Sequence, residues 1–179
     1  MSFRTGRRKD DSTYRYPVRH PSDNYRIEVE LTPEYMKWAM EQESKNISKL
    51  EDIMKPYILE NPLIFVGCPE ISNLVYRVFD KLGYDPEVKT GKVEMWNGRD
   101  IQHAWIEVDG WVVETNPSQI FALPLEHSVI KVMPKNVWYF RTNPRDILDA
   151  RGYAFMTQTE AGEKFLNNMA EEIAKKMSE

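Results

Sequence analysis

The segment QHAWIEVDGWVVETNP, residues 102–117, decides the fold. Asp109 and Gly110 stand there between two runs rich in β-branched and aromatic residues. Asp-Gly in that setting is typical of a two-residue type I′ turn. The pattern therefore predicts an antiparallel hairpin in which Val108 faces Trp111.

That register predicts which polar side chains meet across the hairpin. His103 is expected opposite Asn116, and Glu114 is expected opposite Trp105 on the same side of the sheet as His103. One residue lies directly across from the imidazole and the other lies diagonally. Either Asn116 or Glu114 is thus able to reach His103.

The single cysteine of the chain precedes the clearest helical pattern. Gly67, Cys68 and Pro69 follow the apolar run at 63–66, and apolar residues then recur from Ile71 to Leu82 on one helical face, with Gly83 as the stop signal. Proline favours the first helical position, which predicts Cys68 as the N-cap. The helix dipole at that end favours a thiolate.

The remaining pattern predicts an α+β domain with an antiparallel sheet packed against the cysteine-bearing helix. Strands are expected at 25–31, 87–93, 101–108, 111–115, 129–133 and 137–141. Helices are expected within 33–58, broken by Asn61 and Pro62, and at 159–178, where an apolar residue recurs every four positions from Ala161 to Met177. We expect a basic arm (1–30), one domain (31–157), and a helix (158–179) that docks on the domain or on a partner.

Composition excludes several classes of protein. The chain has 179 residues, 41% hydrophobic, and no apolar run approaches the length of a membrane span. One Cys and three His cannot build a cysteine-rich zinc site or an internal disulfide, so Cys68 is expected to act as a thiol without metal or cofactor. The charged amino terminus does not have the pattern of a secretory signal, which predicts a cytoplasmic protein.

Net charge is −4, but residues 1–26 hold seven Arg or Lys against three Asp, which leaves −8 for the rest of the chain. A short basic segment is most often a solvated terminus, with contact to an acidic partner as the alternative. The sequence favours neither a membrane partner nor nucleic acid.

Cysteine catalysis needs a nucleophilic sulfur, an imidazole that holds its proton, and a polar group that orients the imidazole. Cys68, His103 and either Glu114 or Asn116 can supply all three. A lone cysteine is more often a small buried hydrophobe, but this conjunction favours catalysis. Trp105 and Trp111 are expected to line a substrate groove beside His103, and Asn61 is a candidate second oxyanion donor beside the backbone N–H of Cys68.

These residues resemble a known family. Gly67-Cys68 opening a helix, followed by HAWIEVDGWVVET from His103, is similar to the core of transglutaminase-like proteins, a branch of the papain-like cysteine enzymes, over about residues 60–120. The resemblance implies a papain-like fold with Cys68 as nucleophile and His103 as base. The family's third member, an Asp, falls on Glu114, and Asn116 is the alternative, as Asn serves papain-like peptidases.

The predicted function is hydrolysis of a peptide, isopeptide or other amide bond through a Cys68 thioester, as in a cysteine protease. One alternative is a transglutaminase-type transfer to an amine. A second is a non-catalytic binding module on the same fold, in which Cys68 is unreactive. A third is an adaptor acting through the basic arm, whose binding is salt-dependent and survives loss of Cys68.

Overall fold

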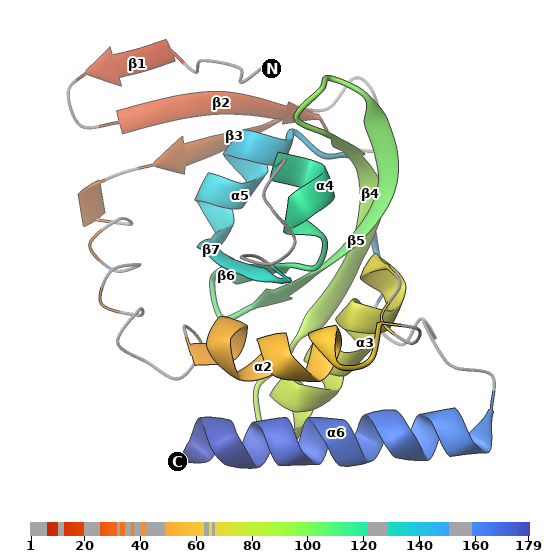
Figure 1. Ribbon diagram of the computed structural model, residues 1–179. Coiled ribbons are helices and arrows are strands. Elements are labelled where there is room, and N and C mark those ends of the chain that lie inside the picture. Colours follow the sequence, from red (N-terminus) through yellow and green to blue (C-terminus); the bar gives the residue numbers. More distant parts are fainter. Residues whose placement is uncertain are drawn as a thin grey trace.

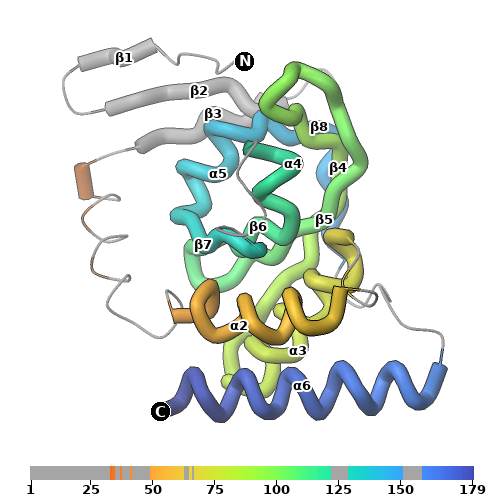
Figure 2. Tube along the Cα trace, in the orientation of Figure 1, coloured from red at the N-terminus to blue at the C-terminus, as the bar shows by residue number. Residues whose placement is uncertain are grey.

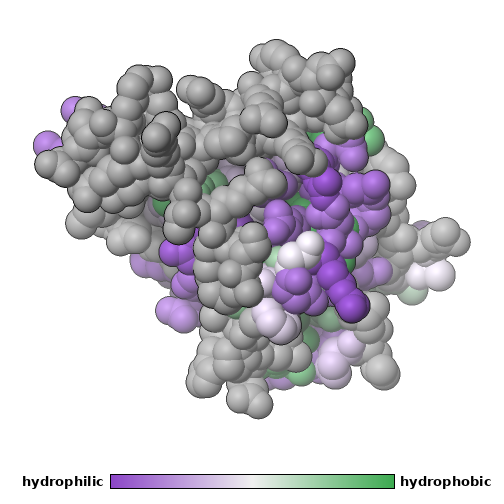
Figure 3. Space-filling view, turned by 90° about the horizontal axis from the view of Figure 1, so that it is seen from above, coloured by the Kyte–Doolittle hydropathy of each residue, from purple (hydrophilic) through white to green (hydrophobic). Residues whose placement is uncertain are grey.

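The computed structural model describes residues 7–10, 13–19, 26–31, 33, 34, 37, 41, 49–62, 65, 67–121, 129–150 and 159–179. It is an α+β structure in which helices pack on a five-stranded antiparallel sheet (Figure 1), as the sequence predicts at that coarse level. Within these parts of the chain, no helix has both the length and the apolar composition that crossing a bilayer requires. The described surface seen in Figure 3 is mainly hydrophilic.

The five-stranded sheet has the order β7-β6-β5-β4-β8, with every neighbouring pair antiparallel. Its strands are β4 Glu87–Glu94, β5 Asp100–Val108, β6 Trp111–Glu114, β7 Lys131–Pro134 and β8 Arg145–Asp149. The sequence predicted the first four within a few residues and missed β8. A separate antiparallel sheet joins β1 Arg7–Asp10, β2 Thr13–Arg19 and β3 Arg26–Leu31, of which only β3 was predicted.

The β5–β6 hairpin has the predicted turn and register. Asp109 and Gly110 have φ values of 50° and 80°, as a type I′ turn requires. Val108 pairs with Trp111 and Trp105 pairs with Glu114. Strand β6 ends at Glu114, so no strand pairing extends to the predicted position of Asn116 opposite His103.

Helix α3 carries the cysteine and spans Cys68–Lys81. Gly67 is its N-cap, so Cys68 is the first helical residue and not the N-cap that the sequence predicted. The reason is that the proline occupies the second position of the first turn, where its missing N–H is equally harmless. The helix ends before Gly83, whose φ of 83° is the left-handed conformation expected after a helix.

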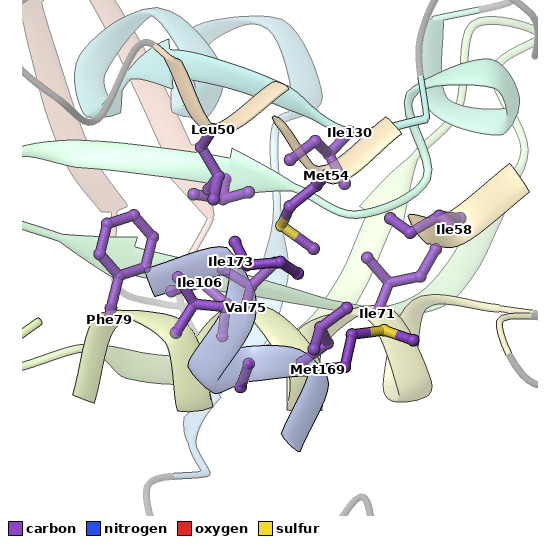
Figure 4. Packing of buried hydrophobic residues seen from close by; sticks show 14 of the residues in the cluster. Leu50, Met54, Ile58, Ile71, Val75, Phe79, Ile106, Ile130, Met169 and Ile173 are labelled. Atoms are coloured by element: carbon purple, nitrogen blue, oxygen red, sulfur yellow. The ribbon is translucent and has the colours of Figure 1, made fainter. Parts of the chain in front are cut away.

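One face of the sheet is covered by α3, by α2 Leu50–Leu59 and by α6 Glu160–Ser178 (Figures 1 and 2). The side chains between them form the larger hydrophobic core, in which Met54, Val75, Ile106 and Ile173 are buried together (Figure 4). The prediction of helix within 33–58 is confirmed over α2, and positions 35–36, 38–40 and 42–48 lie outside the described residues.

The other face of the sheet is covered by α5 Lys135–Thr142, where the sequence predicted a strand at 137–141. Helix α5 buries Trp138, Tyr139 and Thr142, a spacing that fits one side of a helix. A strand would have turned either Trp138 or Tyr139 toward solvent, because neighbouring residues alternate in direction. Burial of both aromatic rings against Trp105 therefore outweighs their β-propensity.

Helix α6 begins at the predicted point, with the Thr159 hydroxyl accepting the Gly162 N–H at 3.1 Å. Its buried face differs from the predicted stripe, because Ala161 and Phe165 are exposed and Leu166 is buried. A row of every fourth residue drifts by about 40° per step at 3.6 residues per turn, so five such residues, four steps apart from first to last, cannot all lie on one face.

Candidate active site

A buried histidine–carboxylate pair lies on the face of the sheet covered by α5. The Nε2 atom of His103 lies 2.5 Å from Oε1 of Glu114, and the two side chains are 1% and 0% exposed. A carboxylate only accepts hydrogen bonds, so Nε2 carries a hydrogen and donates a hydrogen bond to Glu114. The other ring nitrogen, Nδ1, is left to face a different partner.

Both oxygens of Glu114 are held in place by donors. The Asn116 backbone N–H donates to Oε1 at 2.8 Å, and the Trp138 indole N–H donates to Oε2 at 2.7 Å. A fully buried carboxylate is costly unless it is paired in this way. Three donors therefore fix the orientation of the Glu114 carboxylate before any ligand arrives.

The thiol reaches this pair from the start of α3. The Cys68 side chain lies within hydrogen-bonding reach of the His103 imidazole, and Cys68 itself is partly exposed. Burial opposes the charged imidazolium, but the Glu114 carboxylate and the contact with Cys68 outweigh it and raise the pKa of His103 to about 10. The electrostatics thus favour a protonated imidazole beside the sulfur.

Two hydroxyls link the first turns of α3 to the sheet. Ser72 Oγ donates to Thr115 Oγ1 at 3.4 Å, and Thr115 Oγ1 donates to the carbonyl of Ala104 at 2.7 Å. Ser72 lies one helical turn after Cys68, and Ala104 follows His103 on β5. This chain of bonds holds the start of α3 against the strand that carries the histidine.

Of the two predicted orienting residues, the structure places Glu114 on the imidazole and Asn116 elsewhere. The Asn116 amide donates to Gln119 Oε1 at 2.7 Å and its carbonyl oxygen accepts from Ser118 at 3.2 Å. Its side chain thus bonds within the start of α4, Pro117–Phe121. The chain turns into α4 directly after β6, so Asn116 contributes its backbone N–H and not its amide to the site.

The expectation that Trp105 and Trp111 line one groove is wrong. Trp105 is 0% exposed and stacks behind the His103 ring with 6.2 Å between centroids, so it forms a buried wall. Trp111 pairs with Val108, whose parity along β5 is opposite to that of His103 and Trp105. Its side chain is therefore buried in the core on the α3 face.

The third predicted substrate contact, Asn61, is engaged at the end of α2. Its amide donates to the backbone carbonyl of Tyr57 at 2.7 Å. This bond satisfies one of the carbonyls that a helix end leaves without a partner. Asn61 thus has a structural task here, and the oxyanion role predicted for it has no support from its position.

A pocket of about 170 Å³ adjoins the start of α3. Its lining is mostly apolar and comes from the end of α2, the start of α3 and the segment after β6: Ile58, Leu59, Pro62, Phe65, Gly67, Ile71, Thr115, Asn116 and Val129. Gly67 precedes Cys68, and Asn116 binds the Glu114 carboxylate. The pocket is therefore lined in part by the immediate chain neighbours of Cys68 and of Glu114.

Two contributors to the site escaped the sequence patterns. Trp138 lay in a segment predicted as a strand, and its indole donor can be placed on Glu114 only once α5 is known. The sequence predicts Thr115 as the last residue of a strand. Its position between Glu114 and Asn116 indicates that it lies close to the site. Within the described residues, no cluster of His, Cys, Asp and Glu has the makeup of a metal site.

Comparison of the chain with protein-family models, curated proteins and solved structures gives no significant match. The chemistry of the site therefore rests on its own geometry.

Proposed function

We propose that this protein is a cysteine-dependent acyl-transfer enzyme, with a papain-like core of the transglutaminase-like kind, that hydrolyses an amide or isopeptide bond through a Cys68 thioester. The observation that carries the proposal is that the His103 imidazole contacts both the Cys68 thiol and the buried Glu114 carboxylate. A cysteine with a purely structural role does not require a histidine beside it whose carboxylate partner is held by three hydrogen-bond donors.

In this mechanism the Cys68 sulfur attacks the carbonyl carbon of the substrate as a thiolate, and the carbonyl becomes an oxyanion. The backbone N–H of Cys68 is suited to bind that oxygen, because it lies in the first turn of α3, where no intrahelical acceptor is available. The first helical bond here runs from Ile71 N–H to the Gly67 carbonyl.

His103 then moves the proton. Its Nδ1–H protonates the leaving nitrogen, the carbon–nitrogen bond breaks, and the acyl group remains on sulfur. A water molecule attacks the thioester and gives its proton back to Nδ1, after which the carbon–sulfur bond breaks and the acid leaves. Glu114 stays ionised and stabilises the imidazolium through Nε2–H.

The test is the rate of Cys68 alkylation by iodoacetamide as a function of pH, read by intact mass. The chain has one cysteine, so each protein molecule reports one site. Rapid alkylation that persists well below pH 8 in the native protein and is lost in His103→Ala supports the proposal. His20→Ala is the matched control, because the sequence assigns that histidine no role.

Slow alkylation that is the same in the native protein and in His103→Ala would contradict the proposal and favour the non-catalytic binding module. If the thiol is activated, incubation of a fluorogenic amide with and without a primary amine separates hydrolysis from transfer. Hydrolysis yields a free acid in both cases, whereas a transferase yields a new amide whose mass includes the amine. Hydrolysis is the expected result, because a transferase must also exclude water.

A further inference from the structure

The pocket beside Cys68 has the size of one apolar side chain. Its volume of about 170 Å³ is close to that of engineered protein cavities of about 150 Å³ that take up benzene. Pockets that hold a whole drug-sized ligand are about two to six times larger, at about 300–1,000 Å³. The space thus suits a leucine- or phenylalanine-sized group.

The position of the pocket relates it to the acyl side of a substrate. Gly67 and Ile71 lie on either side of Cys68 along α3, and Thr115 and Asn116 directly follow Glu114. A group in the pocket is therefore flanked by both elements of the thiol–imidazole–carboxylate site. The rest of the lining is apolar and includes Ile58 and Leu59 of α2, and Phe65.

The charge at this position disfavours an anionic occupant. A Glu70 oxygen lies 3.8 Å from the place where a Cβ on Gly67 would stand, so a carboxylate stands close to Gly67, one of the residues that line the pocket. An aspartate side chain has nearly the shape of leucine but would meet apolar walls and a like charge. A comparison of substrates that carry leucine or aspartate at this position therefore tests the preference of the pocket for an apolar side chain at nearly constant size.

We infer that this pocket binds a large apolar side chain, of leucine or phenylalanine size, on the acyl-donating residue of the substrate. The inference rests on the proposed function, since it assigns the residue whose carbonyl forms the Cys68 thioester. It makes the substrate class a peptide or acyl amide with an apolar residue at the bond that is cleaved.

The test uses acetyl-amino-acid chloromethyl ketones that differ only in their side chain: Gly, Leu, Phe and Asp. The Cys68 sulfur forms a bond to the methylene carbon and displaces chloride, so intact mass gives a second-order rate for each probe. We expect the Leu and Phe probes to react roughly 10- to 100-fold faster than the Gly and Asp probes, given what burying a few methylene groups contributes.

Leu59→Gln tests the pocket without removing a core residue, since Leu59 is 43% exposed at its rim. Glutamine keeps the size and helix propensity of leucine but places an amide on the wall. The Leu-to-Gly rate ratio is expected to fall at least roughly three-fold, about the contribution of one methylene group. The matched control is Leu148→Gln, an exposed leucine of β8 that does not line the pocket, and its ratio is expected to stay at the native value.

A binding measurement separates the pocket from the chemistry. In Cys68→Ala, N-acetyl-leucine methylamide is expected to shift the amide NMR signals of Gly67, Thr115 and Asn116, and the aspartate analogue is not. If iodoacetamide shows an activated thiol but the probes react alike whatever their side chain, the pocket inference is overturned and the proposed function stands. If the thiol is inert while the leucine compound still binds, the proposed function is overturned, and the acyl role of the pocket with it.

Discussion

Nε2 of His103 lies 2.5 Å from Oε1 of Glu114, and the two side chains are only 1% and 0% exposed. Glu114 is the last paired residue of β6 in the β5–β6 hairpin, and α4 begins soon after it at Pro117. A buried charge in this position is stable only because its partners are fixed.

Glu114→Gln is expected to lower the pKa of His103, because the opposite charge is lost and burial then acts against the imidazolium. Both oxygens of Glu114 accept hydrogen bonds from N–H donors, and glutamine replaces one of these oxygens by an NH₂ group. That NH₂ group must therefore face at least one of the three donors. We expect a loss of about 1–3 kcal/mol in the free energy of unfolding. NMR titration of His103 and urea denaturation measure the two effects. Glu60→Gln, at an exposed position, is the control, and an unchanged pKa of His103 would contradict the assignment of Glu114.

Trp138→Phe is expected to remove one hydrogen bond from the carboxylate while keeping an aromatic ring against Trp105. A hydrogen bond to a charged group contributes about 1.5–3 kcal/mol, so the variant is expected to be less stable by that order. Its alkylation profile for Cys68 is also expected to shift in pH. The control Trp111→Phe changes a buried tryptophan on the opposite face and is expected to cost stability without moving the profile. Equal shifts in both variants would count against Trp138 as a positioning residue.

The stability of the protein is expected to fall as pH rises from about 6.5 to about 10. The pKa of His103 is raised from the ordinary 6.5 to about 10 in the folded protein, so the folded protein binds this proton more tightly than the unfolded chain does. The contribution is complete below pH 6.5 and is lost progressively up to pH 10. Urea midpoints measured across this range should decline in the native protein and in Cys68→Ser, which removes the thiol titration. His103→Gln should be flatter, and a decline as steep as in the native protein would refute the linkage.

Ile173→Ala is expected to destabilise the whole domain by about 2–5 kcal/mol. The reason is that the Ile173 side chain on α6 is fully buried in the larger hydrophobic core. Helix α6 is also tied to α3 by Arg77, whose guanidinium donates to both oxygens of Glu163 at 2.8 Å. A single cooperative transition at lower urea concentration is the expected readout. Asn168→Ala, on the exposed face, should change stability by less than about 0.5 kcal/mol. An unaltered main transition in Ile173→Ala would mean that α6 unfolds separately.

The hairpin could be predicted because its signals are local. Asp109 and Gly110 adopt the positive φ values that their residue types tolerate, and the period of two along the strands then places Glu114 on the same side as His103. The same argument failed for Asn116, since a strand register holds only as far as the strand continues. Pro117 at the start of α4 was the sequence feature that marks the change.

Residues whose partners come from distant segments could not be placed in this way. Trp138 reaches Glu114 across 24 positions, and its β-like sequence gave no sign of α5. The two tryptophans of the hairpin were expected to line one groove beside His103. Parity alone puts them on opposite faces, and burial of Trp105 behind His103 follows from α5 covering that face.

The amino-acid sequence by itself determined the existence of the helix that ends before Gly83, the turn at Asp109 and Gly110, and the nearness of Glu114 to His103, because propensity, capping and strand period act over a few residues. The tertiary structure alone decided that Cys68 meets His103, that Trp138 and the Asn116 N–H hold Glu114, and that a small apolar pocket lies beside the thiol. Those contacts join α3, the sheet and α5, and they exist only because burying apolar surface brings separate segments together.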